Sequence, residues 1–137
     1  MGRYNRTPDS DLVIAASVEY TATGTSTAVE IPSVGAGDSA LELMLDIDAL
    51  GGTHDATNHF KVELEAGETS GGTFYIVDGV AVTTDTLAVG ANVIGLNTRQ
   101  IAEAVGSQDA AFYRLTITKV GTTATGATLS ADFTKGK

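Results

Sequence analysis

The sequence predicts an all-β protein, an antiparallel β-sandwich or jelly roll of seven or eight strands with at most one short helix. Three observations predict this fold. Apolar and polar residues alternate in several segments, glycine-rich turns separate these segments, and no strand–helix–strand rhythm is visible. With 137 residues, 42% apolar residues and no cysteine, the chain fits one domain that is stabilised by packing rather than by disulfides.

Two strands are expected before Pro32. The segment 12–20 (LVIAASVEY) is apolar and leads into the turn Thr23-Gly24-Thr25, which suits a strand at this length. A second short strand is predicted over residues 27–31. It ends at Pro32 because proline has no backbone N–H to donate.

The clearest strand pattern lies in the middle of the chain. Apolar residues occupy every second position of segment 41–48, and the pattern returns in segment 59–66. Successive side chains of a strand point to opposite faces, so both segments predict half-buried strands. We expect them to pair across the polar loop 51–58, with Lys61 opposite acidic neighbours on the solvent face.

The next forty residues contain shorter elements. Asp78-Gly79 joins the expected strands 73–77 and 80–83 in a hairpin. Irregular strands are expected over residues 86–96. Residues 97–105 are the helix candidate, because Asn97 can cap its start and Gly106 can end it.

Two strands close the chain, over residues 111–120 and 127–133, and both alternate apolar and polar side chains. Together with the central strands they define the expected core. Its members are Leu43, Leu45, Phe60, Val62, Leu64, Leu115, Ile117, Leu129 and Phe133.

Charge separates the ends of the chain from its body. All 17 acidic residues lie between Asp9 and Asp132, whereas half of the eight basic residues lie outside that span. An acidic body repels nucleic acid and anionic lipid, so we expect direct binding to neither nucleic acid nor membrane. Residues 1–10 are predicted to form a flexible N-terminal arm, and residues 11–137 a single β-sandwich domain.

Four short patterns have a possible chemical meaning. Gly37-Asp38-Ser39 is similar to the start of one class of esterase, but such enzymes need a parallel α/β scaffold and a histidine base, so a turn is favoured. Asn5-Arg6-Thr7 matches a glycosylation triplet.

The other two patterns concern metals. His54, Asp55 and His59 could approach a metal only if their loop folded back, and Asp46 and Asp48 could hold calcium with Asp55. Solvated loop residues and an ordinary acidic face are the favoured interpretations. We therefore expect no catalytic residue, no cofactor and no metal site, and the chain is not expected to be an enzyme.

Several stretches share a pattern of composition and order with a known family. An apolar first strand leads into Tyr20-Thr-Ala-Thr-Gly-Thr-Ser-Thr27, and the alternating segment 41–48 follows. Late in the chain come Phe112-Tyr-Arg-Leu-Thr-Ile-Thr118, Gly121-Thr-Thr-Ala-Thr125 and Ala127-Thr-Leu-Ser-Ala-Asp-Phe133. These stretches resemble the small β-sandwich proteins that decorate, or cement, the capsids of tailed bacteriophages. The resemblance stops between Thr83 and Gly106, where this sequence inserts the expected helix.

The resemblance implies a virion structural protein that binds the major capsid protein in many copies and stabilises the shell. It further implies a homo-oligomer, dimer or trimer, on the outer capsid surface of a virion assembled in the host cytoplasm. A basic arm on an acidic body can be ordered by docking onto a partner, and many copies add their modest affinities. The residues expected to contact the capsid or a neighbouring subunit are Arg3, Tyr4, Arg6, Lys135 and Lys137.

Two alternative functions stay open. One is a tail or head-completion component of the same type of virus. The other is a carbohydrate-binding or adhesin-like β-sandwich, which would present aromatic rings to sugars on one sheet face. The chain has no tryptophan, and its four tyrosines are widely spaced along the sequence, so such a platform is difficult to assemble.

Overall fold

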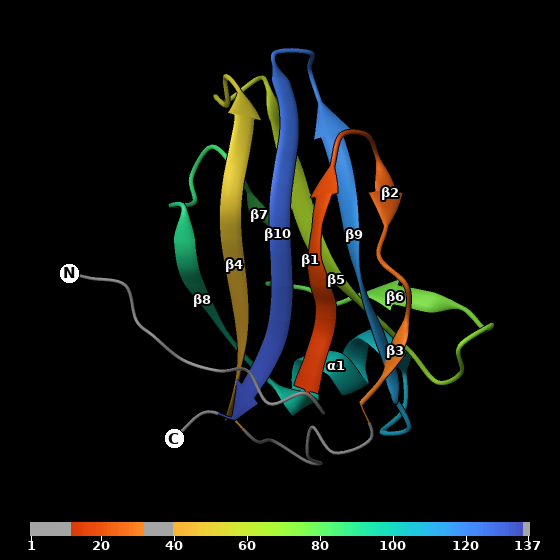
Figure 1. Ribbon diagram of the computed structural model, residues 1–137. Helices are drawn as coiled ribbons and strands as arrows, with labels where there is room; N and C mark the ends of the chain where they lie inside the picture. The colour runs from red at the N-terminus through yellow and green to blue at the C-terminus, as the bar shows by residue number, and fades with distance from the viewer. Residues whose placement is uncertain (1–11, 32–39, 136–137) are drawn as a thin grey trace.

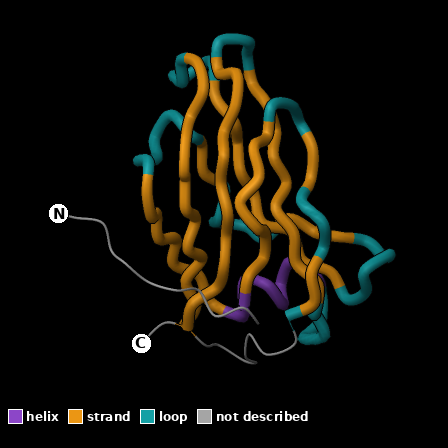
Figure 2. Tube along the Cα trace, viewed as in Figure 1, coloured by secondary structure: helices purple, strands orange, loops and turns teal. Residues whose placement is uncertain are grey.

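The computed structural model describes residues 12–31 and 40–135, which form two antiparallel sheets packed face to face (Figure 1). Strands and the turns between them make up nearly all of this part of the chain, and a short helix lies at one end (Figure 2). The predicted fold class, an all-β antiparallel sandwich with one short helix, is confirmed.

Sheet A has four strands in the order β1, β10, β4 and β8. The strands are β1 (Val13–Tyr20), β10 (Ala124–Lys135), β4 (Ala40–Gly52) and β8 (Gly90–Asn97). The two longest strands, β10 and β4, pair along almost their whole length at the centre of this sheet. The edges are therefore β1 on one side and β8 on the other.

Sheet B has six strands, with β9 and β5 at its centre. Its members are β2 (Gly24–Thr25), β3 (Val29–Glu30), β9 (Phe112–Val120), β5 (His59–Gly67), β6 (Phe74–Ile76) and β7 (Val82–Thr83). Both β2 and β3 pair with β9, and both β6 and β7 pair with β5. The described residues thus form ten strands. Three of these have only two residues, and the total exceeds the seven or eight strands that the sequence predicted.

The core lies between the two sheets and follows the predicted alternation. All nine residues expected in the core are buried, each with at most 1% of its surface exposed. They belong to one cluster of buried side chains, which also contains Ile14, Ile31 and Tyr113. Period-two alternation therefore assigned the inner face of four strands correctly, because each strand has one apolar face to bury.

The helix α1 (Thr98–Val105) begins and ends where the sequence predicts. The Asn97 side chain accepts a hydrogen bond from the Gln100 N–H, and the Gln100 side chain accepts one from the Asn97 N–H, which makes a capping box. Gly106 ends the helix with φ of 86°, a left-handed conformation that glycine adopts without a steric penalty. Gln100 also donates to the Asp78 carbonyl and so ties the helix to the β6–β7 connection.

The predicted pairing of segments 41–48 and 59–66 is wrong. These segments are β4 and β5, which lie in opposite sheets, because β10 and β8 occupy both edges of β4. Lys61 lies between Thr118 and Thr83 on the neighbouring strands, and its ammonium is 3.6 Å from Glu63 on its own strand. The connection 53–58 thus crosses from one sheet to the other.

The predicted Asp78-Gly79 hairpin is also wrong. Strands β6 and β7 pair one after the other with the same edge of β5, so they do not pair with each other. Val77 and Val80 are each only 1% exposed. Their burial holds the turn against the core, which keeps both strands on one edge.

Two further segments differ from expectation. Residues 90–97 form the regular strand β8, in register with β4 over eight residue pairs, where irregular strands were predicted. The predicted first strand is the edge strand β1, which buries only Ile14 and Ala15 and has two register shifts against β10. Its sequence is apolar on both faces, so alternation could not show that half of it is exposed.

We expect Leu45→Ala to lower the free energy of unfolding by about 2–5 kcal/mol, because Leu45 is completely buried at the centre of sheet A. Urea denaturation measures this loss. Val89→Ala is the matched control: Val89 is 63% exposed, so its change is expected to stay within about 0.5 kcal/mol. A loss at Leu45 as small as that of the control would contradict the assignment of this strand face.

Tyr113 gives a second prediction, because burial raises its pKa to about 12 from the usual 10.0. Its hydroxyl is buried and has no hydrogen-bond partner among the described residues, and its ring meets Phe133 edge-on. Below pH 10 the phenol is neutral in both the folded and the unfolded chain. Between pH 10 and about 12 only the unfolded chain loses the proton, so stability falls as pH rises.

At about pH 11 the wild type should therefore have lost about 1 kcal/mol of its free energy of unfolding. The variant Tyr113→Phe should not show this loss, because it has no hydroxyl at this position to ionise. The measurement is urea denaturation at neutral and alkaline pH. Tyr75→Phe, at a ring that is 43% exposed, is the control and should follow the wild type. Equal alkaline losses in all three proteins would show that Tyr113 ionises freely in the folded state.

Candidate functional site

Most of the residues expected to make contacts lie outside the described part of the chain. This applies to Arg3, Tyr4, Arg6 and Lys137, and also to Ser39 of the esterase-like tripeptide and to the triplet 5–7. Lys135 is the last residue of β10, where its backbone pairs with Leu41. The contact assignment therefore stays a prediction.

The loop that contains the two histidines is tied together by hydrogen bonds. Asp55 Oδ1 accepts from the backbone N–H of Thr57 and Asn58 and from both of their side chains. These bonds, with the Asn58 side chain first and the Thr57 backbone next, lower the pKa of Asp55. Asn58 Oδ1 accepts in turn from the N–H groups of Thr122 and Thr123, which joins this loop to the β9–β10 turn.

His54 is held between a carbonyl and a hydroxyl. Its Nε2 is 2.9 Å from the Gly51 carbonyl oxygen, which can only accept, so Nε2 carries the proton. Its Nδ1 then accepts from the Thr84 hydroxyl at 2.7 Å, and that hydroxyl oxygen accepts from the Phe60 N–H. Both ring nitrogens of His54 are thus engaged in structural hydrogen bonds.

His59 has partners different from those of His54. Its Nδ1 lies 3.0 Å from the Asp55 carbonyl oxygen and 3.7 Å from an oxygen of Asp85. Within residues 12–31 and 40–135, no three histidine, cysteine, aspartate or glutamate side chains are close enough to hold a metal together. The predicted independence from metal is a matter for experiment.

The outer faces of the two sheets differ in charge. On sheet B two glutamates have basic neighbours. Lys61 lies 3.6 Å from Glu63, and Arg114 donates to Glu65 at 2.6 Å and lies 4.1 Å from the centre of the Phe74 ring. The four strands of sheet A contain five acidic residues and a single basic one, Lys135. Their acidic residues are Glu19, Glu42, Asp46, Asp48 and Asp132.

The two aspartates considered for calcium belong to this acidic face. Asp46 and Asp48 both point outward from β4, and Asp48 accepts a hydrogen bond from the Ser17 hydroxyl. Asp55 lies in the β4–β5 connection, where its carboxylate caps its own loop. The structure therefore shows Asp48 and Asp55 engaged in hydrogen bonds within the fold.

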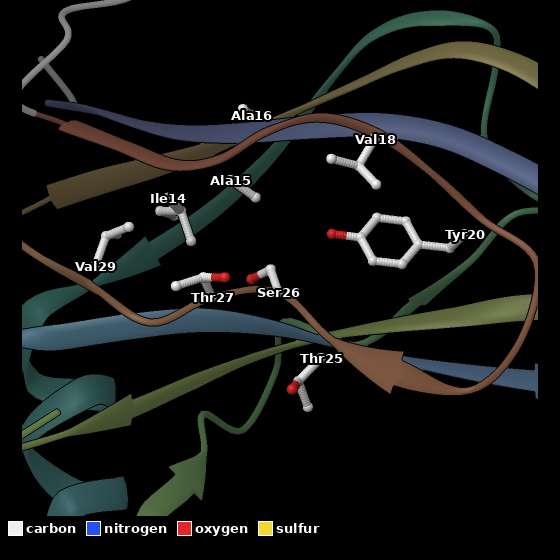
Figure 3. Close-up of a pocket in the computed structure, with 9 residues that line it drawn as sticks. All are labelled: Ile14, Ala15, Ala16, Val18, Tyr20, Thr25, Ser26, Thr27 and Val29. Carbon is white, nitrogen blue, oxygen red and sulfur yellow. The ribbon is translucent and has the colours of Figure 1, made fainter. Parts of the chain in front are cut away.

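A groove of about 360 Å³ opens at one edge of the sandwich, between β1 of sheet A and the segment that contains β2 and β3 of sheet B (Figure 3). Val18 and Tyr20 extend from β1 toward Ser26 and Thr27 on the opposite wall. Val18 is 49% exposed, and partial burial raises the pKa of Tyr20. The full lining is Ile14, Ala15, Ala16, Val18, Tyr20, Thr25, Ser26, Thr27 and Val29.

The chemistry of the groove suits apolar contacts. Tyr20 is its one ionisable lining residue, and the Ser26 hydroxyl accepts a hydrogen bond from the Leu115 N–H. The groove therefore contains no acid–base pair for catalysis and no charge to hold an ionic ligand. Sequence reasoning missed it, although the apolar residues on both faces of segment 12–20 were a usable signal for an uncovered strand.

Comparison with known proteins gives little further information. The chain matches no protein-family model and no curated protein. It is similar to a chain from the structure of infectious bursal disease virus, Gx strain, with 18% identity and a TM-score of 0.39. The match covers 90% of this chain but 29% of that one, so this chain spans less than a third of its length. A likeness this distant carries no argument about function.

No helix among the described residues is long and apolar enough to cross a membrane.

The hydrogen bond between His54 and Thr84 gives a third prediction. Thr84 is 1% exposed, so removing His54 leaves the buried Thr84 O–H without an acceptor and should cost about 1–3 kcal/mol. The variants His54→Ala, Thr84→Val and their combination form a double-mutant cycle, measured by urea denaturation. We expect the double variant to lose less stability than the sum of the single losses.

Additive losses would show that the two side chains do not interact. A chelator provides a separate check on the role of His54. EDTA should leave the melting temperature of the wild type unchanged, since a bound metal would stabilise the folded state by mass action. A melting temperature that falls on chelation would contradict the structural role given to this histidine.

Proposed function

We propose that this chain is a virion structural protein, a capsid decoration protein that binds the major capsid protein in many copies and stabilises the shell. The observation that carries the proposal is the position in the fold of the stretches that resemble capsid decoration proteins. They form β10 and β4, the centre of sheet A, together with β1 beside β10 and the central strand β9 of sheet B. The resemblance thus follows the framework of the sandwich.

The segment in which the resemblance stops lies at the periphery. Residues 83–106 contain β8, which is an edge strand, and α1, which lies at one end of the sandwich (Figure 1). An insertion at an edge leaves the pairing of the other strands intact. The resemblance is therefore compatible with the whole framework despite the interruption.

The proposed mode of action is binding through charged and apolar contacts. Five residues near the ends of the chain are proposed to contact the capsid or a neighbouring subunit. They are Arg3, Tyr4, Arg6, Lys135 and Lys137. Arginine forms bidentate bonds to carboxylates, and repeated binding across a lattice adds many modest affinities. We further propose a homo-oligomer, dimer or trimer, on the outer capsid surface of a virion assembled in the host cytoplasm, without enzymatic activity.

A carbohydrate-binding role has less support from the described tyrosines. Tyr113 is completely buried, Tyr20 lines the groove and Tyr75 lies on β6. Three rings in three different environments do not make one aromatic surface. A tail or head-completion role uses the same kind of fold, so the experiment has to separate it from decoration.

The test is co-sedimentation of the purified chain with empty capsids of the major capsid protein encoded in the same genome, and separately with isolated tails. We expect binding to capsids that saturates at a fixed number of copies per capsid subunit. Arg3→Gln combined with Arg6→Gln should weaken attachment about tenfold or more, because each lost charge-assisted bond is worth about 1.5–3 kcal/mol. Arg99→Gln, at an exposed arginine of α1, is the matched control and should bind as the wild type does.

Three results would overturn the proposal. Binding to tails but not to capsids would indicate a tail component. Retention on immobilised glycans without capsid binding would indicate a carbohydrate-binding module. Absence of binding to all three ligands would contradict a virion attachment role altogether.

A further inference from the structure

The strand β8 forms an edge of sheet A and lacks the features that normally keep edge strands from pairing (Figure 1). Among the described residues it pairs with β4 alone, so the backbone groups on its other side have no strand partner there. Proteins usually protect such an edge with a bulge, a charged residue or a proline. The pairing of β8 with β4 runs through eight consecutive residue pairs without a register shift. No charged residue and no proline occur between Asp85 and Arg99.

The opposite edge of sheet A provides a contrast. There β1 pairs with β10 through two register shifts, and it carries the charged residue Glu19. Bulges bend an edge strand away from a partner, and a charge makes the pairing of two edges costly. Of the two edges of sheet A, β8 is therefore the one that is suited to accept a further strand.

The outward side chains of β8 are small, apolar and accessible. Residues paired across a ladder share a face, and Leu43, which faces the core, is paired with Ile94. Alternation along the strand then turns Ala91, Val93 and Gly95 outward. All three are exposed, Val93 by 55% of its surface. A strand added beside β8 would cover this apolar strip without meeting a charge.

Gly95 has no role among the described residues that requires glycine. Its φ is not positive, and a Cβ at this position would find no heavy atom of the described fold within 4 Å. Glycine weakens the interior of a strand, and it often marks a place where another backbone approaches closely. Gly95 therefore fits a position that a second molecule approaches.

A second copy of the chain suits this edge electrostatically. The chain has a net charge of −9, so two copies repel each other unless they meet where charges are absent. The acidic residues nearest to β8 in the sheet are Glu42 and Asp46, one strand behind on β4. Across two paired β8 strands the two β4 strands lie three spacings apart, about 14 Å, which exceeds the screening length of about 8 Å at physiological ionic strength. The repulsion between the copies is therefore weak at this contact.

The strand is also self-complementary about a two-fold axis. Facing residues of an antiparallel pair share a face, so a central residue must lie opposite its own counterpart. With Val93 at the centre, Ala91 of one copy faces Gly95 of the other, and small outward side chains meet. A centre at Ile94 would instead use Asn97, whose N–H already donates within the helix cap. Val93 is therefore the better centre.

The contact is comparable with known interfaces in its hydrogen bonds. Every second facing pair of an antiparallel ladder exchanges two backbone hydrogen bonds, so residues 90–96 of two copies form about six to eight. A typical protein interface has about ten, with a spread of about five. Val89, which is 63% exposed and directly precedes β8, adds apolar surface. These contacts are sufficient for a specific and reversible dimer.

We propose that two copies of this chain associate through antiparallel pairing of β8 with β8, with Val93 facing Val93. Their A sheets then join into one continuous sheet of eight strands, four from each copy. This pairing gives the homo-oligomer of the proposed function a surface and a copy number, and it rests on that part of the proposed function alone. It requires no capsid.

Sedimentation equilibrium of the purified chain over a range of concentrations is the first test. We expect a monomer–dimer equilibrium that Val93→Lys weakens about tenfold or more, because the two-fold axis sets two ammonium groups opposite each other. Val18→Lys is the matched control, since Val18 is 49% exposed on the other edge of the same sheet. It changes the net charge equally and should leave the equilibrium unchanged. Circular dichroism checks the fold of both variants.

Cross-linking tests the register and stays informative if a lysine variant does not fold. The chain has no cysteine, so an introduced cysteine is the only thiol. A short bis-maleimide should join two copies of Val93→Cys. It should not join two copies of Ala91→Cys, whose thiols are four residues apart along the paired strands, about 13 Å. Val18→Cys is the second control, and cross-linking of either control in preference to Val93→Cys would overturn the pairing.

Three sedimentation results would also overturn it: a monomer up to the highest soluble concentration, a trimer, or a dimer that Val93→Lys leaves intact. If the chain is monomeric and Val93→Lys abolishes capsid binding, β8 pairs with the capsid protein in place of a second copy. A β8 dimer that binds no capsid supports the pairing and contradicts the virion role. A trimer that binds capsids does the reverse, so the two proposals fail separately.

Discussion

The pairing of β10 with β4 is the constraint on which the other contacts depend. It joins the last described strand to the strand that follows residue 39, and its register places Phe133 opposite Leu43 and Leu129 opposite Ile47. A slip by one residue would turn every apolar side chain of one strand toward solvent. Strands β1 and β8 pair with the two outer edges of β10 and β4. The register between β10 and β4 therefore determines which side chains of sheet A face the core.

The connections at one end of the sandwich keep the two sheets in place relative to each other. The β4–β5 and β9–β10 connections both cross between sheets, and Asn58 joins them by accepting two backbone hydrogen bonds. Gly121 has φ of 77°, and a Cβ there would lie 2.5 Å from the Thr57 carbonyl oxygen. The histidine loop that suggested a metal is thus part of the structure that aligns the sheets.

The two outer faces suit different partners. On sheet B, Arg114 and Lys61 compensate nearby glutamates, so that face is close to electrostatic balance. The strands of sheet A carry five acidic residues and a single lysine, and the centre of the sheet buries an aspartate and a methionine. Electrostatic attraction for a basic segment is therefore concentrated on sheet A, whether the segment belongs to this chain or to a partner.

The sequence by itself determined the fold class, the inner faces of β4, β5, β9 and β10, and both caps of α1. Each of these follows from local rules: a period of two, or a capping side chain within three residues. Only the tertiary structure decided that β4 and β5 lie in opposite sheets, that β1 leaves a groove, and that Met44 and Asp132 are buried on the outer face. Strand partners and the cover of a sheet come from residues far apart in the chain, and no local pattern encodes which of several amphipathic strands will meet.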